Sequence, residues 1–215
     1  PISKIIKKKY FWKYEFFVNS DVLDPRPESE LIIEEVLSNL NNRNKNKNKI
    51  KILDIGTGSG CLAISLSKEI NNSVVTAIDI SRKALKVAKK NVGIFDLEKK
   101  VKLKLCDFRD INEKFDIIVS NPPYIKNNDF KDLQIEIKNF EPKIALLAGN
   151  DGLKFYKLFA NSIDKIMKKN SIFVCEIGHD QLNNCKKIFG KSNLKLKKIT
   201  KDIQNINRTL TFSKI

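Results

Sequence analysis

The sequence of 215 residues contains no run of 18 apolar residues, so we expect no membrane-spanning helix. It also has no positively charged, cleavable signal region at its start. The first residue is Pro1 in place of an initiator Met, and we therefore expect a processed or trimmed chain. These absences disfavour a membrane protein.

Residues that bind metals are scarce. The four cysteines (Cys61, Cys106, Cys175 and Cys185) lie far apart and match neither a zinc-binding spacing nor a disulfide framework. We expect them to be small core thiols in a reducing cytosol, which predicts a cytoplasmic protein without a metal site. The one histidine, His179, is expected at the surface and not in catalysis.

Acidic residues are too few to balance the basic ones, since 25 Asp and Glu stand against 41 Lys and Arg and the formal net charge is +16. A surplus of this size can indicate a nucleic-acid partner. The charge is spread over nearly every segment, however, and many lysines adjoin asparagines at positions expected to be solvated. This distribution favours a generally basic surface over a nucleic-acid substrate, although such a surface would also attract an RNA-rich partner. We expect a monomer.

The first 20 residues alternate basic and aromatic side chains and predict a β-hairpin. The alternation places Phe11, Lys13, Glu15 and Phe17 on one side of an extended segment, and Trp12, Tyr14, Phe16 and Val18 on the other. Packing against the domain is one use for so many rings, and stacking on nucleic-acid bases is the alternative.

The next segment, Asp24-Pro25-Arg26-Pro27-Glu28-Ser29-Glu30, is a rigid turn that leads into a helix. Apolar residues recur at helical spacing over residues 32–40. A polar, low-complexity run follows at residues 41–49 and is expected to be a linker. We therefore divide the chain into an N-terminal extension of residues 1–49 and a catalytic domain of residues 50–215.

From residue 50 onward, short apolar runs alternate with amphipathic segments, which is the pattern of βαβ units and a parallel sheet. The expected strands cover residues 50–55, 74–78, 101–105, 115–119 and 172–177, and the expected helices cover residues 61–70, 82–92 (capped by Ser81), 153–169 and 181–189. Residues 194–200 and 209–215 alternate like a closing antiparallel pair. Residues 126–150 form a long loop-rich stretch, and loops of that length are usually functional. The predicted fold class is α/β.

Four groups of polar or small residues follow strands, at the sheet edge where ligands bind in open α/β folds. They are the loop Gly56-Thr57-Gly58-Ser59-Gly60, Asp79, Asp107-Phe108 and the turn Asn121-Pro122-Pro123-Tyr124. Asp79 lies 23 residues after Gly56, close to the spacing of a carboxylate that binds ribose hydroxyls. Dinucleotides and S-adenosylmethionine share this layout. The Gly-x-Gly-x-Gly spacing, combined with the turn after the fourth strand, favours S-adenosylmethionine.

The turn after the fourth strand is stiff, because each proline fixes its own φ and keeps the preceding residue out of the α region. Neither Pro122 nor Pro123 has an N–H, so carbonyl groups nearby are free to accept hydrogen bonds from an incoming NH2 group. The simpler interpretation is a strand-ending turn, since Asn-Pro is a common loop dipeptide.

Residues 54–60 and 120–124, together with Pro25-Arg26-Pro27-Glu28-Ser29-Glu30, resemble the glutamine-N5 methyltransferases that modify peptide chain release factors. The likeness continues through Glu141-Pro142, Gly149-Asn150-Asp151-Gly152 and Glu176-Ile177-Gly178 and so covers nearly the whole chain. It implies a Rossmann-like class I methyltransferase: a seven-stranded, mostly parallel sheet with an antiparallel C-terminal strand pair, here preceded by a hairpin. The sequence departs from the family at Asp24, where an apolar residue is usual, and at Lys7, where glycine is usual. The helical domain that normally comes first is also missing, so we expect either a fragment or another way of recognising the substrate.

The resemblance also implies the reaction, methyl transfer from S-adenosylmethionine to the glutamine of a release factor's Gly-Gly-Gln loop. For the cofactor, it implies that the methionine part is lined by Gly56, Thr57, Gly58, Ser59 and Gly60. Asp79 would take the ribose hydroxyls, Phe108 would lie against the adenine, and Asn121 would also border the cofactor. The glutamine amide would be held, and the catalysis carried, by Asn121, Pro122, Pro123 and Tyr124.

The chemistry agrees with these roles. An amide nitrogen is a poor nucleophile because its lone pair is delocalised. Acceptors on the Asn121 side chain and the Pro122 carbonyl would bind both N–H bonds and aim the nitrogen at the methyl group. Two other functions stay open: an adenine-N6 methyltransferase acting on RNA or DNA, which would grip an exocyclic amine with the same turn, and a basic RNA-binding module with a vestigial cofactor site.

Overall fold

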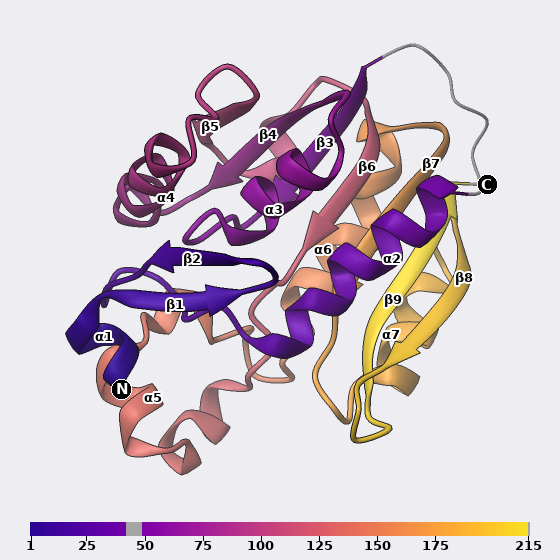
Figure 1. Cartoon of the computed structure of the whole chain (residues 1–215). Helices are drawn as coiled ribbons and strands as arrows, with labels where there is room; N and C mark the ends of the chain where they lie inside the picture. Colours follow the sequence, from indigo (N-terminus) through magenta and orange to yellow (C-terminus); the bar gives the residue numbers. More distant parts are fainter. Residues whose placement is uncertain (42–48, 215) are drawn as a thin grey trace.

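The computed structural model describes residues 1–41 and 49–214, and its centre is a seven-stranded sheet in the order β5-β4-β3-β6-β7-β9-β8 (Figure 1). The strands are β3 (Ile50–Ile55), β4 (Ser73–Asp79), β5 (Val101–Leu105), β6 (Phe115–Ser120), β7 (Met167–Glu176), β8 (Leu194–Lys201) and β9 (Asn207–Lys214). Strands β3 to β7 run parallel to one another, whereas β9 is antiparallel to both β7 and β8. The predicted α/β fold with an antiparallel C-terminal pair is confirmed.

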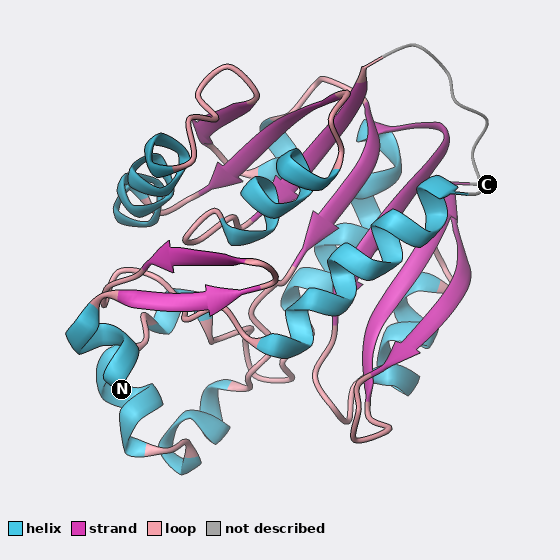
Figure 2. Cartoon of the chain, viewed as in Figure 1, coloured by secondary structure: helices cyan, strands magenta, loops and turns pink. Residues whose placement is uncertain are grey.

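Helices cover both faces of this sheet (Figure 2). On one face lie α2 (Glu30–Asn41), α3 (Cys61–Glu69) and α4 (Arg82–Ile94), and on the other lie α6 (Lys154–Ser162) and α7 (Leu182–Phe189). Successive strand residues therefore enter different cores: Ile52 packs on the α2–α3 side and Leu53 on the α6–α7 side, and both are fully buried. Burial on both faces explains why the central strands are continuous apolar runs.

The N-terminal hairpin is present, but the face that it buries differs from the prediction. It consists of β1 (Lys8–Phe11) and β2 (Tyr14–Phe17), preceded by the short helix α1 (Ile2–Ile6), which the sequence did not indicate. Phe11 pairs with Tyr14, so the turn contains two residues and Phe11 and Phe16 share the buried face. The prediction put them on opposite sides, and it was wrong because alternation does not continue through a turn in which the chain reverses.

Two boundaries also differ from expectation. The helix expected over residues 153–169 ends at Ser162 and is followed by a 3-10 turn (Ile163–Ile166). The strand β7 begins at Met167 because that residue already pairs with Phe115 of β6.

The stretch 126–150 is not simply a loop, since it contains α5 (Ile135–Phe140) and 3-10 turns at Asn127–Asp132 and Lys143–Ala145.

Several other expectations can be placed in the fold. Most of the predicted linker, residues 42–48, lies outside the described residues, and the division at residue 49 stays a prediction. His179 is exposed as expected, and the four cysteines are free thiols, of which Cys175 and Cys185 are buried. Across the described part of the chain, none of the helices is long and apolar enough to cross a membrane.

Candidate active site

The loop between β3 and α3 folds back over the end of β4. The backbone N–H groups of Gly56 and Thr57 both donate to the Ile78 carbonyl at 2.9 Å. Gly56, Gly58 and Gly60 all have positive φ, between 55° and 84°, which only glycine adopts without strain. The glycine spacing thus builds a turn whose backbone stays close to the strand end.

Asp79, at the end of β4, is held by this loop. Its Oδ2 accepts a hydrogen bond from the Gly58 N–H at 3.0 Å, and its Oδ1 accepts one from the Ser81 N–H at 2.8 Å. Each oxygen keeps a second lone pair, which a ligand hydroxyl can use. Burial raises the pKa of Asp79 above its usual value, against the effect of these two bonds.

Beneath the loop, Asp54 accepts a hydrogen bond from the Thr57 hydroxyl at 2.6 Å. Burial, with a smaller contribution from repulsion by Asp79, raises the pKa of Asp54 to about 7. Asp54 is fully buried, so it supports the loop and does not face a ligand.

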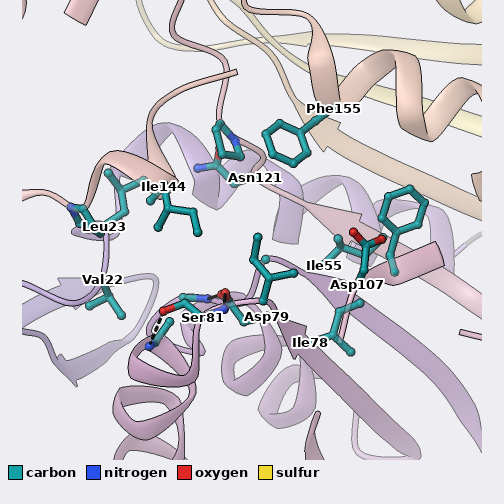
Figure 3. Close-up of a pocket in the computed structure, with 18 of the residues that line it drawn as sticks. Val22, Leu23, Ile55, Ile78, Asp79, Ser81, Asp107, Asn121, Ile144 and Phe155 are labelled. Atoms are coloured by element: carbon teal, nitrogen blue, oxygen red, sulfur yellow. Dashed lines mark hydrogen bonds between the residues drawn. The ribbon is translucent and has the colours of Figure 1, made fainter. Parts of the chain in front are cut away.

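A cavity opens at these strand ends, and we call it the strand-end cavity (Figure 3). Figure 3 shows Asp79 and Ser81 along one side, Asn121 and Phe155 opposite them, and the apolar side chains of Ile55 and Ile78 on the sheet side. Of the residues predicted to bind a cofactor, Gly56, Gly58, Asp79, Phe108 and Asn121 line it. Thr57 and Ser59 line a smaller neighbouring cavity, whereas Gly60, the N-cap of α3, lines neither of these two cavities.

Phe108 contributes little surface to the strand-end cavity. Its ring packs edge-on against Phe159 at a centroid distance of 5.2 Å, and the residue is 6% exposed. The neighbouring Asp107 is more open, and a hydrogen-bonded ion pair with Arg109 lowers the pKa of its carboxyl.

The loop before α2 supplies a wall that sequence reasoning missed. Val22 and Leu23 line the strand-end cavity from the side opposite the sheet (Figure 3). Lys4 of α1 holds this loop, because its Nζ donates to the carbonyls of Asn19 at 2.9 Å and Val22 at 2.7 Å. The sequence offered no periodic pattern at these positions that could have indicated the contact.

The turn 121–124 is anchored from behind by Gln181. The Gln181 Nε2 donates to the carbonyls of Tyr124 at 3.0 Å and Gly152 at 3.1 Å, and its Oε1 accepts from the Gly178 N–H. Gly152 has φ +71°, and a Cβ there would lie 2.6 Å from the Tyr124 carbonyl oxygen. The segments 149–152 and 176–178, which carried part of the resemblance, thus meet behind the turn.

A second group of side chains holds Asn121 and Tyr124. The Asn121 Nδ2 donates to the Ser29 Oγ at 2.7 Å, and the Ser29 hydroxyl donates to Glu176 Oε2 at 2.5 Å. The Tyr124 hydroxyl donates to Glu176 Oε1 at 3.3 Å. Burial raises the pKa of Glu176 to about 7. Two sequence features could have indicated Glu176 and Ser29. Glu176 is a carboxylate at the end of an apolar strand, and Ser29 belongs to a Pro-Arg-Pro segment that is richer in polar residues than a turn requires.

The four predicted turn residues also border a second cavity, which we call the turn cavity. Its polar lining comes from Arg26, Glu28, Glu176 and Arg208, beside Tyr124. Asn121 and Pro123 line both this cavity and the strand-end cavity. The turn is therefore the partition between two cavities. The strand-end cavity is mainly apolar and its charged lining residues are all acidic (Asp21, Asp79 and Asp107), whereas the turn cavity is lined by groups of both charges.

Known proteins are similar to this chain in sequence and in fold. The family model for the Methyltransferase small domain matches residues 29–139. The release factor glutamine methyltransferase of Mycoplasma mycoides is 42% identical over 217 residues, which cover 98% of this chain and 75% of the relative. The bifunctional methyltransferase of Rickettsia bellii is 39% identical over 239 residues, which cover 100% of this chain and 43% of the relative. The chain thus spans less than half the length of that relative.

Among solved structures, the ribosomal protein L11 methylase from Lactobacillus delbrueckii subsp. bulgaricus has a TM-score of 0.60 at 18% identity, over 87% of this chain and 77% of that one. This likeness concerns the fold. Identity of about 40% across three quarters of a relative, on a sheet whose strand ends carry the glycine loop and the Asn-Pro-Pro-Tyr turn, shows that the chain belongs to the release factor glutamine methyltransferase family.

Proposed function

We propose that this chain transfers a methyl group from S-adenosylmethionine to the side-chain amide nitrogen (N5) of the glutamine in the Gly-Gly-Gln loop of peptide chain release factors. The observation that carries the proposal is the position of Asn121 and Pro123 between two cavities. A methyl donor in the strand-end cavity and an amide in the turn cavity would meet at this partition. Membership of the family supports the choice of acceptor.

The strand-end cavity fits S-adenosylmethionine in its chemistry. Asp79 keeps free lone pairs for the two ribose hydroxyls, and the apolar surface of Ile78, Ile80 and Phe155 suits an adenine ring. The glycine loop lets the methionine part approach the backbone closely. When bound, S-adenosylmethionine supplies an electrophilic methyl group on a sulfonium sulfur and leaves as S-adenosylhomocysteine.

The turn residues act on the acceptor. The Asn121 side-chain oxygen accepts one N–H of the glutamine amide, and the Pro122 carbonyl accepts the other, so that the nitrogen is fixed toward the strand-end cavity. Positioning of this kind supplies several kcal/mol without a dedicated base. The proton leaves after methyl transfer, so the exposed His179 has no part in the reaction.

The test is transfer of labelled methyl from S-adenosylmethionine to a purified release factor, with a second release factor whose loop glutamine is replaced by alanine. Label on the wild-type loop alone, located by peptide mapping, supports the proposal. RNA and DNA oligonucleotides containing adenine form the third arm, and label there in preference to the release factor would favour the adenine-N6 alternative.

The proposed substrate and the four free thiols support a cytoplasmic place for this reaction. The expected monomeric state stays a prediction.

A further inference from the structure

Asn121 is the end of a chain of buried hydrogen bonds that leads away from the strand-end cavity to Glu176, at the wall of the turn cavity. Its Nδ2 donates to the Ser29 Oγ at 2.7 Å, and Ser29 donates to Glu176 at 2.5 Å. Ser29 is 3% exposed and Glu176 is 1% exposed, so water does not compete for these bonds. The chain joins residues 92 and 147 positions apart in the sequence, from the Pro-Arg-Pro turn, the Asn-Pro-Pro-Tyr turn and the end of β7.

The direction of this chain depends on the charge of Glu176. A carboxylate only accepts hydrogen bonds, and Glu176 accepts one from Ser29 and one from Tyr124. The single proton of the Ser29 hydroxyl is then committed to Glu176, and only a lone pair of Ser29 remains for Asn121. The Asn121 side chain must therefore present its NH2 group to Ser29, and its carboxamide oxygen then points away from Ser29.

We propose that ionised Glu176, acting through Ser29, is the positioning group that keeps the Asn121 side-chain oxygen turned toward the methyl acceptor. This inference rests on the proposed function, in which that oxygen accepts an N–H of the substrate amide. It gives Ser29 and Glu176 a role in the reaction although neither touches the reacting nitrogen.

Protonation of Glu176 removes this control. A carboxylic acid donates its own proton to Ser29, whose hydroxyl is then free to donate to Asn121. The amide would rotate to present its oxygen to Ser29 and its NH2 group to the substrate NH2, where two donors face each other. The methyl-transfer rate should therefore fall when Glu176 takes up a proton.

The surroundings of Glu176 set the pH at which this happens. Burial is the main cause that raises its pKa to about 7, the nearby Glu28 adds to the rise, and the bonds from Ser29 and Tyr124 and the charge of Arg208 oppose it. The titratable and charged groups that face it from the elements packed around it are Glu28, Tyr124, Tyr156, Cys175 and Arg208, with Arg26 lining the same cavity.

The experiment is single-turnover methyl transfer to the release factor at saturating S-adenosylmethionine, from about pH 6 to pH 9, in wild type, Glu176→Gln, Ser29→Ala and Ser29→Thr. The wild-type rate should rise about tenfold per pH unit below the transition and level off above an apparent pKa near 7. Glu176→Gln and Ser29→Ala should lower the plateau by roughly 10- to 100-fold and remove the transition, with the KM for release factor little changed. Ser29→Thr keeps the hydroxyl and should therefore show both the wild-type plateau rate and the wild-type pH transition.

Glu35→Gln is the matched control. Glu35 is also a buried glutamate, 3% exposed, but it bonds to Lys198 and Thr200 of β8 and lies outside both cavities. This variant should keep the wild-type pH profile. A Glu176→Gln protein that folds, judged by its circular dichroism, and keeps the wild-type plateau and transition would overturn the proposal, and so would the same behaviour in Ser29→Ala.

A second measurement separates this inference from the proposed function, because it needs no methyl acceptor. The 15N-labelled side-chain amide of Asn121, assigned by its loss in Asn121→Ala, should shift with an apparent pKa near 7 in wild type and not in Glu176→Gln or Ser29→Ala. If this titration is seen but no release factor is methylated, the proposed function fails and the coupling stands. If release factor is methylated but the Asn121 amide does not respond to pH, the coupling fails alone.

Discussion

Lys4 and Asp24 form an ion pair of 2.7 Å between Nζ and Oδ1, in which the two side chains are only 6% and 5% exposed. Glu141 lies beside it, with its Oε2 3.6 Å from the Lys4 Nζ and accepting the Asp24 N–H at 3.1 Å. Lys4 also holds the carbonyls of Asn19 and Val22. A charged cluster thus fastens α1 to the loop that walls the strand-end cavity.

We expect Lys4→Met to destabilise the protein by about 3–5 kcal/mol, because it leaves the buried Asp24 carboxylate without its cation, whereas Glu141 keeps its ion pair with Arg26. It should also weaken S-adenosylmethionine binding, since Val22 and Leu23 lose their support. The double variant Lys4→Met/Asp24→Leu should recover much of the stability. Urea unfolding and calorimetric titration measure the two effects. Lys83→Met is the control, because Lys83 pairs with Asp21 of the same loop but is 78% exposed; equal losses from both lysines would contradict the prediction.

Asp79→Ala should weaken S-adenosylmethionine binding by roughly 1.5–3 kcal/mol for each charge-assisted hydrogen bond lost to a ribose hydroxyl. The glycine loop should loosen as well, because the Gly58 and Ser81 N–H groups lose their acceptor. Asp79→Asn keeps one acceptor oxygen and should fall between wild type and alanine. An unchanged calorimetric affinity in Asp79→Ala would remove Asp79 from the proposed ribose site.

Asn121→Ala should lower the rate of methyl transfer by roughly 10²- to 10³-fold, the usual loss when one positioned polar contact to a reacting group is deleted. The alanine leaves the substrate N–H facing an apolar wall, whereas cofactor affinity should hardly change. Asn121→Asp keeps an acceptor and should retain more activity than alanine, although it loses the donor to Ser29. Single-turnover kinetics decide between them, and a wild-type rate in Asn121→Ala would make the turn purely structural.

Gly152→Ala should cost more stability than Gly149→Ala, although both glycines have φ near +70° to +85°. The left-handed conformation alone costs about 1–2 kcal/mol for alanine at either position. At Gly152 the new Cβ would also meet the Tyr124 carbonyl at 2.6 Å and the Gln181 Nε2 at 2.9 Å, whereas at Gly149 its nearest neighbour is the Lys154 Cβ at 3.8 Å. We expect a further loss of about 1–3 kcal/mol in urea unfolding and a lower methyl-transfer rate, because the Asn-Pro-Pro-Tyr turn must move. Equal effects from the two variants would show that the contact with Tyr124 is easily relieved.

The sequence alone determined the sheet and its ligand-binding edge. Strands β3, β4 and β6 are largely apolar because both of their faces are buried. Gly56 and Asn121 directly follow strands, and Asp79 is the last residue of one. Since parallel strands end at one edge, local pattern was enough to bring these residues together. The cap on α4 was also predictable from local sequence, because the Ser81 hydroxyl oxygen accepts a hydrogen bond from a residue only three positions ahead, the Ala84 N–H at 3.2 Å.

Other features depended on contacts that no local pattern encodes. The faces of the hairpin followed from the two-residue turn between Phe11 and Tyr14, and the early end of α6 followed from the pairing of Met167 with Phe115. The orientation of Asn121 was set by Ser29 and Glu176, and the loop wall by Lys4. A polar side chain in the core must find a partner wherever the fold brings one within reach, so its role is decided by packing between distant segments and not by its neighbours in the sequence.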